Sequence, residues 1–151
     1  MPQKLYDILA IGNAIIDVFS QCSDDFLLKN AIEKGGMNLV DAAASQSLLA
    51  AISVVAPPQL ISGGSAANTA VGLAAVGGKA AFVGRVHDDE LGAAFCRDII
   101  AAGVTFAAIP AKNGAPTASS IILVTPDAAR SMNTFLGASI EFEPEDINLT
   151  A

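Results

Sequence analysis

The sequence predicts an α/β fold built on a mostly parallel sheet. Short apolar segments alternate with helical segments along the chain, which is the pattern of parallel strands joined by helices. Hydrophobic residues make up 52% of the 151 residues, enough to bury the core of about one domain. A glycine pair, Gly63-Gly64, stands directly before a helical segment, where it lets the backbone approach a ligand closely.

Two extended segments joined by a turn open the chain. Residues 5–11 predict a buried strand, and Gly12-Asn13 predicts the turn at its carboxyl end. Residues 14–21 predict a second extended segment, in which successive side chains face opposite sides. Asp17 shares one face of this segment with two apolar residues, so its carboxylate needs hydrogen-bonding partners.

Polar caps mark the next two helices. Ser23 is the predicted N-cap of a helix to about residue 32, which Gly35-Gly36 ends. Asp41 is the predicted N-cap of a helix to about residue 54, and Pro57-Pro58 stops it.

Later elements follow from periodicity and turn residues. Leu91, Phe95 and Ile99 recur four residues apart and predict the clearest amphipathic helix. The predicted elements after residue 58 are helices at 65–76 and 88–101, strands at 80–84 and 106–109, a hairpin of 118–124 and 130–136, and a helix start at 143–146.

Composition excludes several classes of function. The net charge is −7, from 8 Lys and Arg against 15 Asp and Glu, and no basic run offers a site for nucleic acid or an anionic membrane. Residues 42–78 are uncharged, but prolines and glycines interrupt them too often for a membrane span. Cys22 and Cys96 lack the spacing of a metal site, which predicts two reduced thiols and no bound metal. The N-terminus has no secretory pattern, so we expect a cytoplasmic protein.

The glycine pair and the helix after it have the chemistry of a ligand site. A helix start presents unpaired N–H groups, which favour hydroxyl oxygens and anions. Asn68 in the first turn adds a donor and an acceptor. The alternative is that Gly63-Gly64 only provides the tight turn into the helix.

These motifs together resemble the ribokinase-like (PfkB) family of sugar and nucleoside kinases. The resemblance covers nearly the whole chain, in three ordered motifs. The only departure is His87, which stands where many members carry glycine. The matching segments are residues 12–17, residues 63–92 with Gly63, Gly64, Asn68, Gly77, Gly78, Gly84, Asp89 and Gly92, and residues 130–137.

The resemblance implies a Rossmann-type sheet with helices on both faces and a small β-sheet lid. The lid strands would be residues 14–21, 35–41 and 118–136. Residues 1–151 would be the N-terminal part of a single kinase domain, truncated before its C-terminal, ATP-binding half. That half holds the family's catalytic base and glycine anion hole, so we expect no catalytic residue in this chain. The missing half would itself be a partner, and a homodimer could form through the lid.

The resemblance also assigns candidate binding residues. Asp17 would accept hydrogen bonds from two acceptor hydroxyls, and Asn13 would add a polar contact; the alternatives are a satisfied strand-end Asp and an Asx turn. Gly63, Gly64 and Asn68 would bind the same hydroxyls from the opposite wall.

The last two candidates belong to the predicted hairpin. Arg130 would reach the acceptor or the phosphates when the lid closes, and Asn133 is a weaker candidate on the phosphate side. The alternative for both is a side chain that faces water. Asp88 and Asp89 are expected to cap their helix rather than bind metal.

The implied function is transfer of the ATP γ-phosphate to a hydroxymethyl group of a sugar or nucleoside, with Mg²⁺ as cofactor. Adenosine kinase is one specific alternative, and a non-catalytic sugar- or nucleoside-binding module is another. A dinucleotide-binding domain is disfavoured, because residues 12–17 lack the G-x-G-x-x-G pattern.

Overall fold

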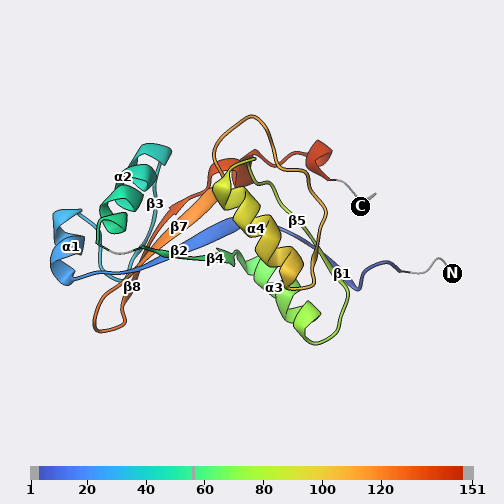
Figure 1. Ribbon diagram of the computed structural model, residues 1–151, viewed down its shortest axis with the longest axis horizontal. Helices are drawn as coiled ribbons and strands as arrows, with labels where there is room; N and C mark the ends of the chain where they lie inside the picture. The colour runs from blue at the N-terminus through green and yellow to red at the C-terminus, as the bar shows by residue number, and fades with distance from the viewer. Residues whose placement is uncertain (1–3, 56, 148–151) are drawn as a thin grey trace. The chain divides into compact units, whose positions relative to one another are not determined.

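The computed structural model describes residues 4–55 and 57–147, which divide into two compact units. Figure 1 labels most of the helices and strands of both. Unit 1 comprises residues 1–16, 62–118 and 136–151, and unit 2 comprises residues 17–61 and 119–135.

Unit 1 is built on a parallel three-stranded sheet in the order β1-β5-β6. Two helices join these strands and pack on them, α3 on β1 and β5, and α4 on β6. Parallel strands joined by helices confirm the predicted fold class. The elements are β1 (Ile8–Ile11), α3 (Ser65–Ala75), β5 (Ala80–Val83), α4 (Glu90–Ala101) and β6 (Thr105–Phe106).

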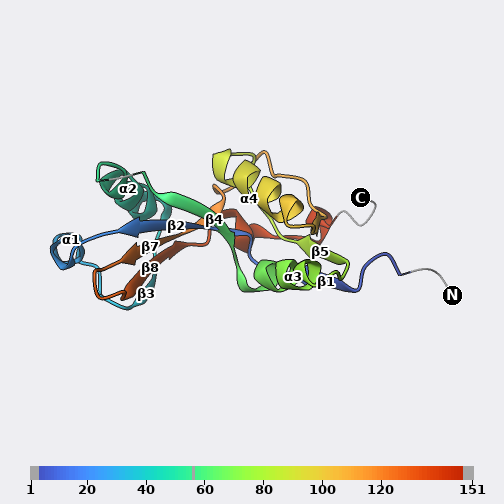
Figure 2. The ribbon, with the colours of Figure 1, turned by 60° about the horizontal axis from the view of Figure 1, so that its bottom comes forward.

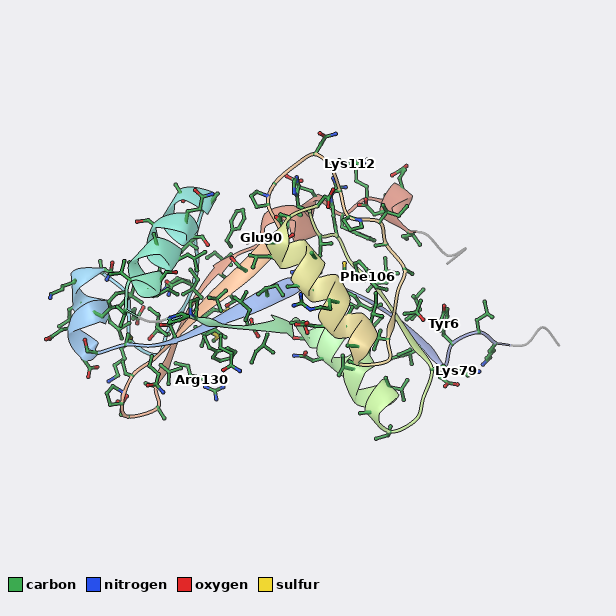
Figure 3. The ribbon with its side chains drawn as sticks, in the orientation of Figure 1. Tyr6, Lys79, Glu90, Phe106, Lys112 and Arg130 are labelled. Atoms are coloured by element: carbon green, nitrogen blue, oxygen red, sulfur yellow. The ribbon has the colours of Figure 1, made fainter. Side chains whose placement is uncertain are left out.

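Three phenylalanines form the centre of the unit 1 core. The ring centroids of Phe82 on β5 and Phe95 on α4 lie 5.7 Å apart, and both side chains are fully buried. Phe106 completes the group from β6, beside α4 in Figure 3, with centroids 6.1 Å and 5.8 Å from the other two. Aromatic pairs at these separations stabilise a core beyond their buried area.

The prediction of a buried first strand is wrong in part. β1 begins at Ile8 rather than at Leu5, and Leu9 and Ile11 are 44% and 55% exposed. β1 is an edge strand of its sheet, and Leu9 and Ile11 alternate onto one face. No described element covers that face at β1, whereas every residue of the central strand β5 is buried.

Unit 2 contains most of a five-stranded mixed sheet in the order β3-β8-β7-β2-β4. β7 and β8 are antiparallel, as the predicted hairpin requires, and β3 pairs with β8 in parallel. The first residues of β2 and β7 and the last of β4 belong to unit 1. The strands are β2 (Ile15–Gln21), β3 (Met37–Leu39), β4 (Gln59–Gly63), β7 (Ala118–Val124) and β8 (Arg130–Phe135).

Two helices accompany this sheet, α1 (Asp24–Lys29) and α2 (Ala42–Ser53). α2 lies along one side of the sheet, as Figures 1 and 2 show, and Ser45 Oγ lies 3.5 Å from Ser119 Oγ of β7. Ser23 and Asp41 cap these helices through hydrogen bonds from Phe26 N and Ala44 N, which confirms both predicted caps.

Some boundaries differ from the predictions. α1 ends before the predicted residue 32, because Ala31 adopts φ 52°, outside the helical region. The strand predicted at 106–109 is β6 at 105–106. β4 and a 3₁₀ helix at Gly137–Glu141 were not predicted, and the predicted helix start at 143–146 is a second 3₁₀ helix, Pro144–Asp146. Among the described residues, no helix combines the length and apolar character of a membrane span.

Candidate functional site

The glycine pair lies where β4 meets α3. β4 ends at Gly63, and Gly64 is the N-cap of α3 with φ 101°. A Cβ at Gly64 would collide with the backbone carbonyl oxygen of Asn13. Only glycine combines this φ with this close approach, so the glycine is required by the backbone itself.

The first turn of α3 has the open N–H groups that the sequence predicts. No side chain caps α3, and its first intrahelical hydrogen bond runs from Asn68 N to the carbonyl of Gly64, 2.8 Å long. Unit 1 therefore brings Asn13, Gly63, Gly64 and Asn68 to one place, the start of this helix. The side chains of Asn13 and Asn68 are exposed and bond to no described residue, so the Asx-turn alternative for Asn13 is not seen there. This set can donate hydrogen bonds to hydroxyl or anionic oxygens.

Asp17 lies in β2 and belongs to unit 2. It is half-buried, and the neighbours that face the other side, Ile16 and Val18, are fully buried. Burial raises the pKa of the Asp17 carboxyl above its usual value. No hydrogen bond or ion pair to its carboxylate occurs among the described residues, so the alternative of a satisfied structural Asp has no support there. A partly desolvated carboxylate without a partner favours a ligand that donates hydrogen bonds.

Arg130 and Asn133 occupy opposite faces of β8. Arg130 is exposed at the start of the strand, beside the hairpin turn in Figure 3. Asn133 is three residues further on, so the strand pleat directs it to the other side. It is 4% exposed, which excludes the water-facing alternative, and it lines a cavity with residues of α2. Of the two, only Arg130 has an exposed side chain that is free to reach a phosphate.

A buried pair of hydroxyls was not singled out from the sequence. Ser120 Oγ of β7 and Thr134 Oγ1 of β8 lie 2.8 Å apart, directly across the antiparallel ladder. One hydroxyl donates to the other, so one hydroxyl hydrogen is left without a described acceptor. By alternation along β8 the pair shares the face of Arg130. The predicted hairpin would have indicated that these two hydroxyls lie opposite each other if the register between β7 and β8 had been known.

Asp89 has a structural role. Its Oδ1 accepts hydrogen bonds from Gly92 N at 2.8 Å and from the hydroxyl of Thr117 at 2.7 Å, while its Oδ2 accepts from Thr117 N at 2.9 Å. This confirms Asp89 as the helix cap and ties α4 to the start of β7. Asp88 is not the cap. His87 Nδ1 lies 3.7 Å from Asp89 Oδ2 in the same cluster.

The described residues do not fit a magnesium site. No group of three or more His, Cys, Asp or Glu side chains among them is arranged to hold a metal ion. Cys22 and Cys96 are free thiols, and burial raises the pKa of each.

Comparison with protein families decides the assignment. Residues 39–150 match the pfkB family of carbohydrate kinases, about three quarters of the chain. The chain belongs to the pfkB family. Its members are carbohydrate and nucleoside kinases, and the match includes the glycine pair, α3, α4 and the hairpin of β7 and β8.

Curated relatives of this pfkB chain include fructokinases. The probable fructokinase-4 of Arabidopsis thaliana is 33% identical over 89 residues, which cover 58% of this chain and 27% of that protein. The fructokinase of Escherichia coli is 31% identical over 87 residues, covering 58% of this chain and 28% of its own length. The aligned part thus spans less than a third of these relatives.

Solved structures give a longer match. The adenosine kinase of Sinorhizobium meliloti is 49% identical with a TM-score of 0.83, covering 95% of this chain and 43% of that one. A probable sugar kinase of Rhizobium etli is 48% identical with a TM-score of 0.84, covering 96% and 43%. The chain therefore has the ribokinase-like fold and spans less than half the length of these two kinases.

Proposed function

We propose that this chain is the acceptor-binding part of an ATP-dependent kinase that phosphorylates a hydroxymethyl group of a sugar or nucleoside. The observation that carries the proposal is the carboxylate of Asp17, which is partly desolvated and has no described partner. Hydroxyl groups of an acceptor would satisfy it, because a carboxylate accepts several hydrogen bonds.

The other candidate residues supply complementary chemistry. Unpaired N–H groups at the start of α3, next to Gly63 and Gly64, can donate to acceptor oxygens. Asn13 and Asn68 each offer an exposed amide that can donate and accept. We propose that these residues of unit 1 contribute hydrogen bonds to the acceptor. Discrimination would come from Asp17, because an acceptor that lacks a hydroxyl leaves this half-buried carboxylate unpaired.

Arg130 is the proposed contact to the phosphates. Its guanidinium is exposed at the hairpin, on the face of β8 that also carries Thr134. An arginine that approaches the transferred phosphoryl group offsets its negative charge. The catalytic base and the groups that hold ATP and Mg²⁺ would come from the part of the relatives' length that this chain does not span.

Adenosine is the acceptor that we would test first. The Sinorhizobium meliloti protein named adenosine kinase is 49% identical over 95% of this chain, whereas the fructokinases are about 33% identical over 58%. The Rhizobium etli protein, 48% identical, is named a probable sugar kinase, so sugars stay in the comparison.

A thermal-shift screen of the full-length protein tests the proposal. The ligands would be ribose, fructose, adenosine, guanosine and inosine, each with and without Mg²⁺–ATP, and ADP release would be measured with every compound that stabilises the protein. We expect stabilisation by one class of compound, followed by ADP release. Stabilisation without ADP release would favour a non-catalytic binding module, and no response would contradict the proposed substrate class.

A further inference from the structure

The cavity that Asn133 lines lies on the α2 side of the sheet in unit 2. Its volume is about 330 Å³, and residues of β3, β8, α2 and the turn after α1 line it. Three of the lining residues are asparagines, Asn30, Asn38 and Asn133, and we name the cavity the Asn pocket. Neither Asp17 nor Arg130 lines it. None of the lining residues carries a charge, so an ionic ligand would find no counter-charge in the walls.

Asn133 is the least exposed of the three asparagines. Its side chain is 4% exposed, and its Nδ2 atom makes no hydrogen bond with any described residue. Buried polar groups in folded proteins nearly always have a partner. A carbonyl, ring nitrogen or hydroxyl of a ligand in the Asn pocket would provide one.

The neighbouring amides add acceptors and donors. Asn38 lies directly beside Asn133 in the parallel pairing of β3 with β8, and both line the pocket. Asn30 donates from Nδ2 to the carbonyl of Phe26 at 2.8 Å, which leaves its Oδ1 as an acceptor. The pocket thus offers donor and acceptor groups side by side, each from an uncharged amide.

We propose that the Asn pocket binds a small, flat, uncharged heterocycle whose edge carries a donor next to an acceptor, the chemistry of a nucleobase. Asparagine amides pair with such edges through two hydrogen bonds at once. Ile32, Val40 and Leu48 line the same cavity and can contact the faces of a ring. The proposal concerns the helix side of the sheet and does not depend on kinase activity.

The test is equilibrium dialysis of the full-length protein with adenine, cytosine and uracil as separate probes. Ala44 and Ala43 are adjacent, exposed residues of α2, and only Ala44 lines the pocket. Ala44→Phe would fill the cavity from a solvent-exposed position, and Ala43→Phe is the matched control. We expect at least one base to bind the wild type and Ala43→Phe equally, and to bind Ala44→Phe at least about tenfold more weakly. The unfolding midpoints of both variants check that they fold.

A second variant tests the role of Asn133. Asn133→Leu removes a buried amide without a described partner, so we expect the variant to fold with equal or higher thermal stability and to lose base binding. Equal affinity in Ala44→Phe and Ala43→Phe would overturn the proposal. Failure of all three bases to bind the wild type up to their solubility would overturn it as well. ADP release by Ala44→Phe would be measured in parallel. If either of these outcomes occurs while ADP release is retained, the Asn pocket proposal fails and the proposed kinase function does not.

Discussion

Asp17 carries an energetic cost in the free protein, because its carboxylate is partly buried without a described partner. Folding raises its pKa, so the folded state holds this proton more tightly than the unfolded chain does. The contribution of Asp17 therefore favours folding at acid pH and is lost as the pH rises through the folded-state pKa. Binding of acceptor hydroxyls has the opposite pH dependence, because binding requires the ionised carboxylate, which forms as the pH rises.

Asp17→Asn is expected to raise the midpoint of thermal unfolding of the ligand-free protein at pH 7. The difference from the wild type should shrink as the pH falls, because the wild-type carboxyl then becomes protonated as well. Asp88→Asn, at an exposed carboxylate, is the control and should change little. Scanning calorimetry between pH 4 and pH 7 measures both. A lower midpoint for Asp17→Asn at pH 7 would show that Asp17 already has a stabilising partner.

Gly64 is the second residue whose role follows from geometry. Gly64→Ala introduces a Cβ at φ 101° and against the carbonyl of Asn13, so we expect a loss of about 2 kcal/mol or more in the free energy of unfolding. Gly72→Ala in the exposed middle of α3 meets no atom within 4 Å and should stabilise the protein by about 0.5–1 kcal/mol. Urea denaturation of both variants makes the comparison, and equal effects would contradict the assigned strain.

The chemistry of these residues could be predicted from the sequence, but their surroundings could not. A glycine pair before a helix and a carboxylate on an apolar strand are local patterns. The burial of Asn133 and its partner Asn38 depends on the pairing of β3 with β8, across nearly a hundred residues of chain. No local pattern specifies that register.

At the scale of elements, the helices were more predictable than the strands. Caps such as Ser23, Asp41 and Asp89 are short-range signals, and each accepts its expected backbone hydrogen bond. β4 was missed because Gln59-Leu60-Ile61 follows two prolines and shows no alternation, and all three residues are exposed. The exposure of β1 depends on which elements cover the sheet, and the alternation of residues along a strand does not predict that.

The two aspartate caps should differ in their contribution to stability. Asp41 accepts one backbone hydrogen bond, so Asp41→Ala should cost about 1 kcal/mol. Asp89 caps α4 and also binds the hydroxyl and the N–H of Thr117, so Asp89→Ala should cost about 3 kcal/mol. Urea titrations give both values. A smaller loss for Asp89→Ala than for Asp41→Ala would contradict the linking role of Asp89.

At the scale of the whole molecule, the chain spans 43% of the length of the Sinorhizobium meliloti adenosine kinase. Leu9 and Ile11 expose a short apolar face on β1, an edge strand. Apolar surface next to an open sheet edge promotes association. Residues 1–151 produced alone should therefore self-associate, and Leu9→Lys combined with Ile11→Lys should reduce this. Sedimentation velocity over a range of concentrations measures the effect, and a monomeric wild-type chain would contradict it.

The central claim is that Asp17 binds acceptor hydroxyls in a kinase of the pfkB family. The most direct test is calorimetric titration of the full-length protein and its Asp17→Ala variant with the acceptor identified by the thermal-shift screen. Loss of a charged hydrogen-bond acceptor should weaken binding by about 2–3 kcal/mol. An unchanged dissociation constant in a folded Asp17→Ala variant would contradict the claim and exclude Asp17 from the site.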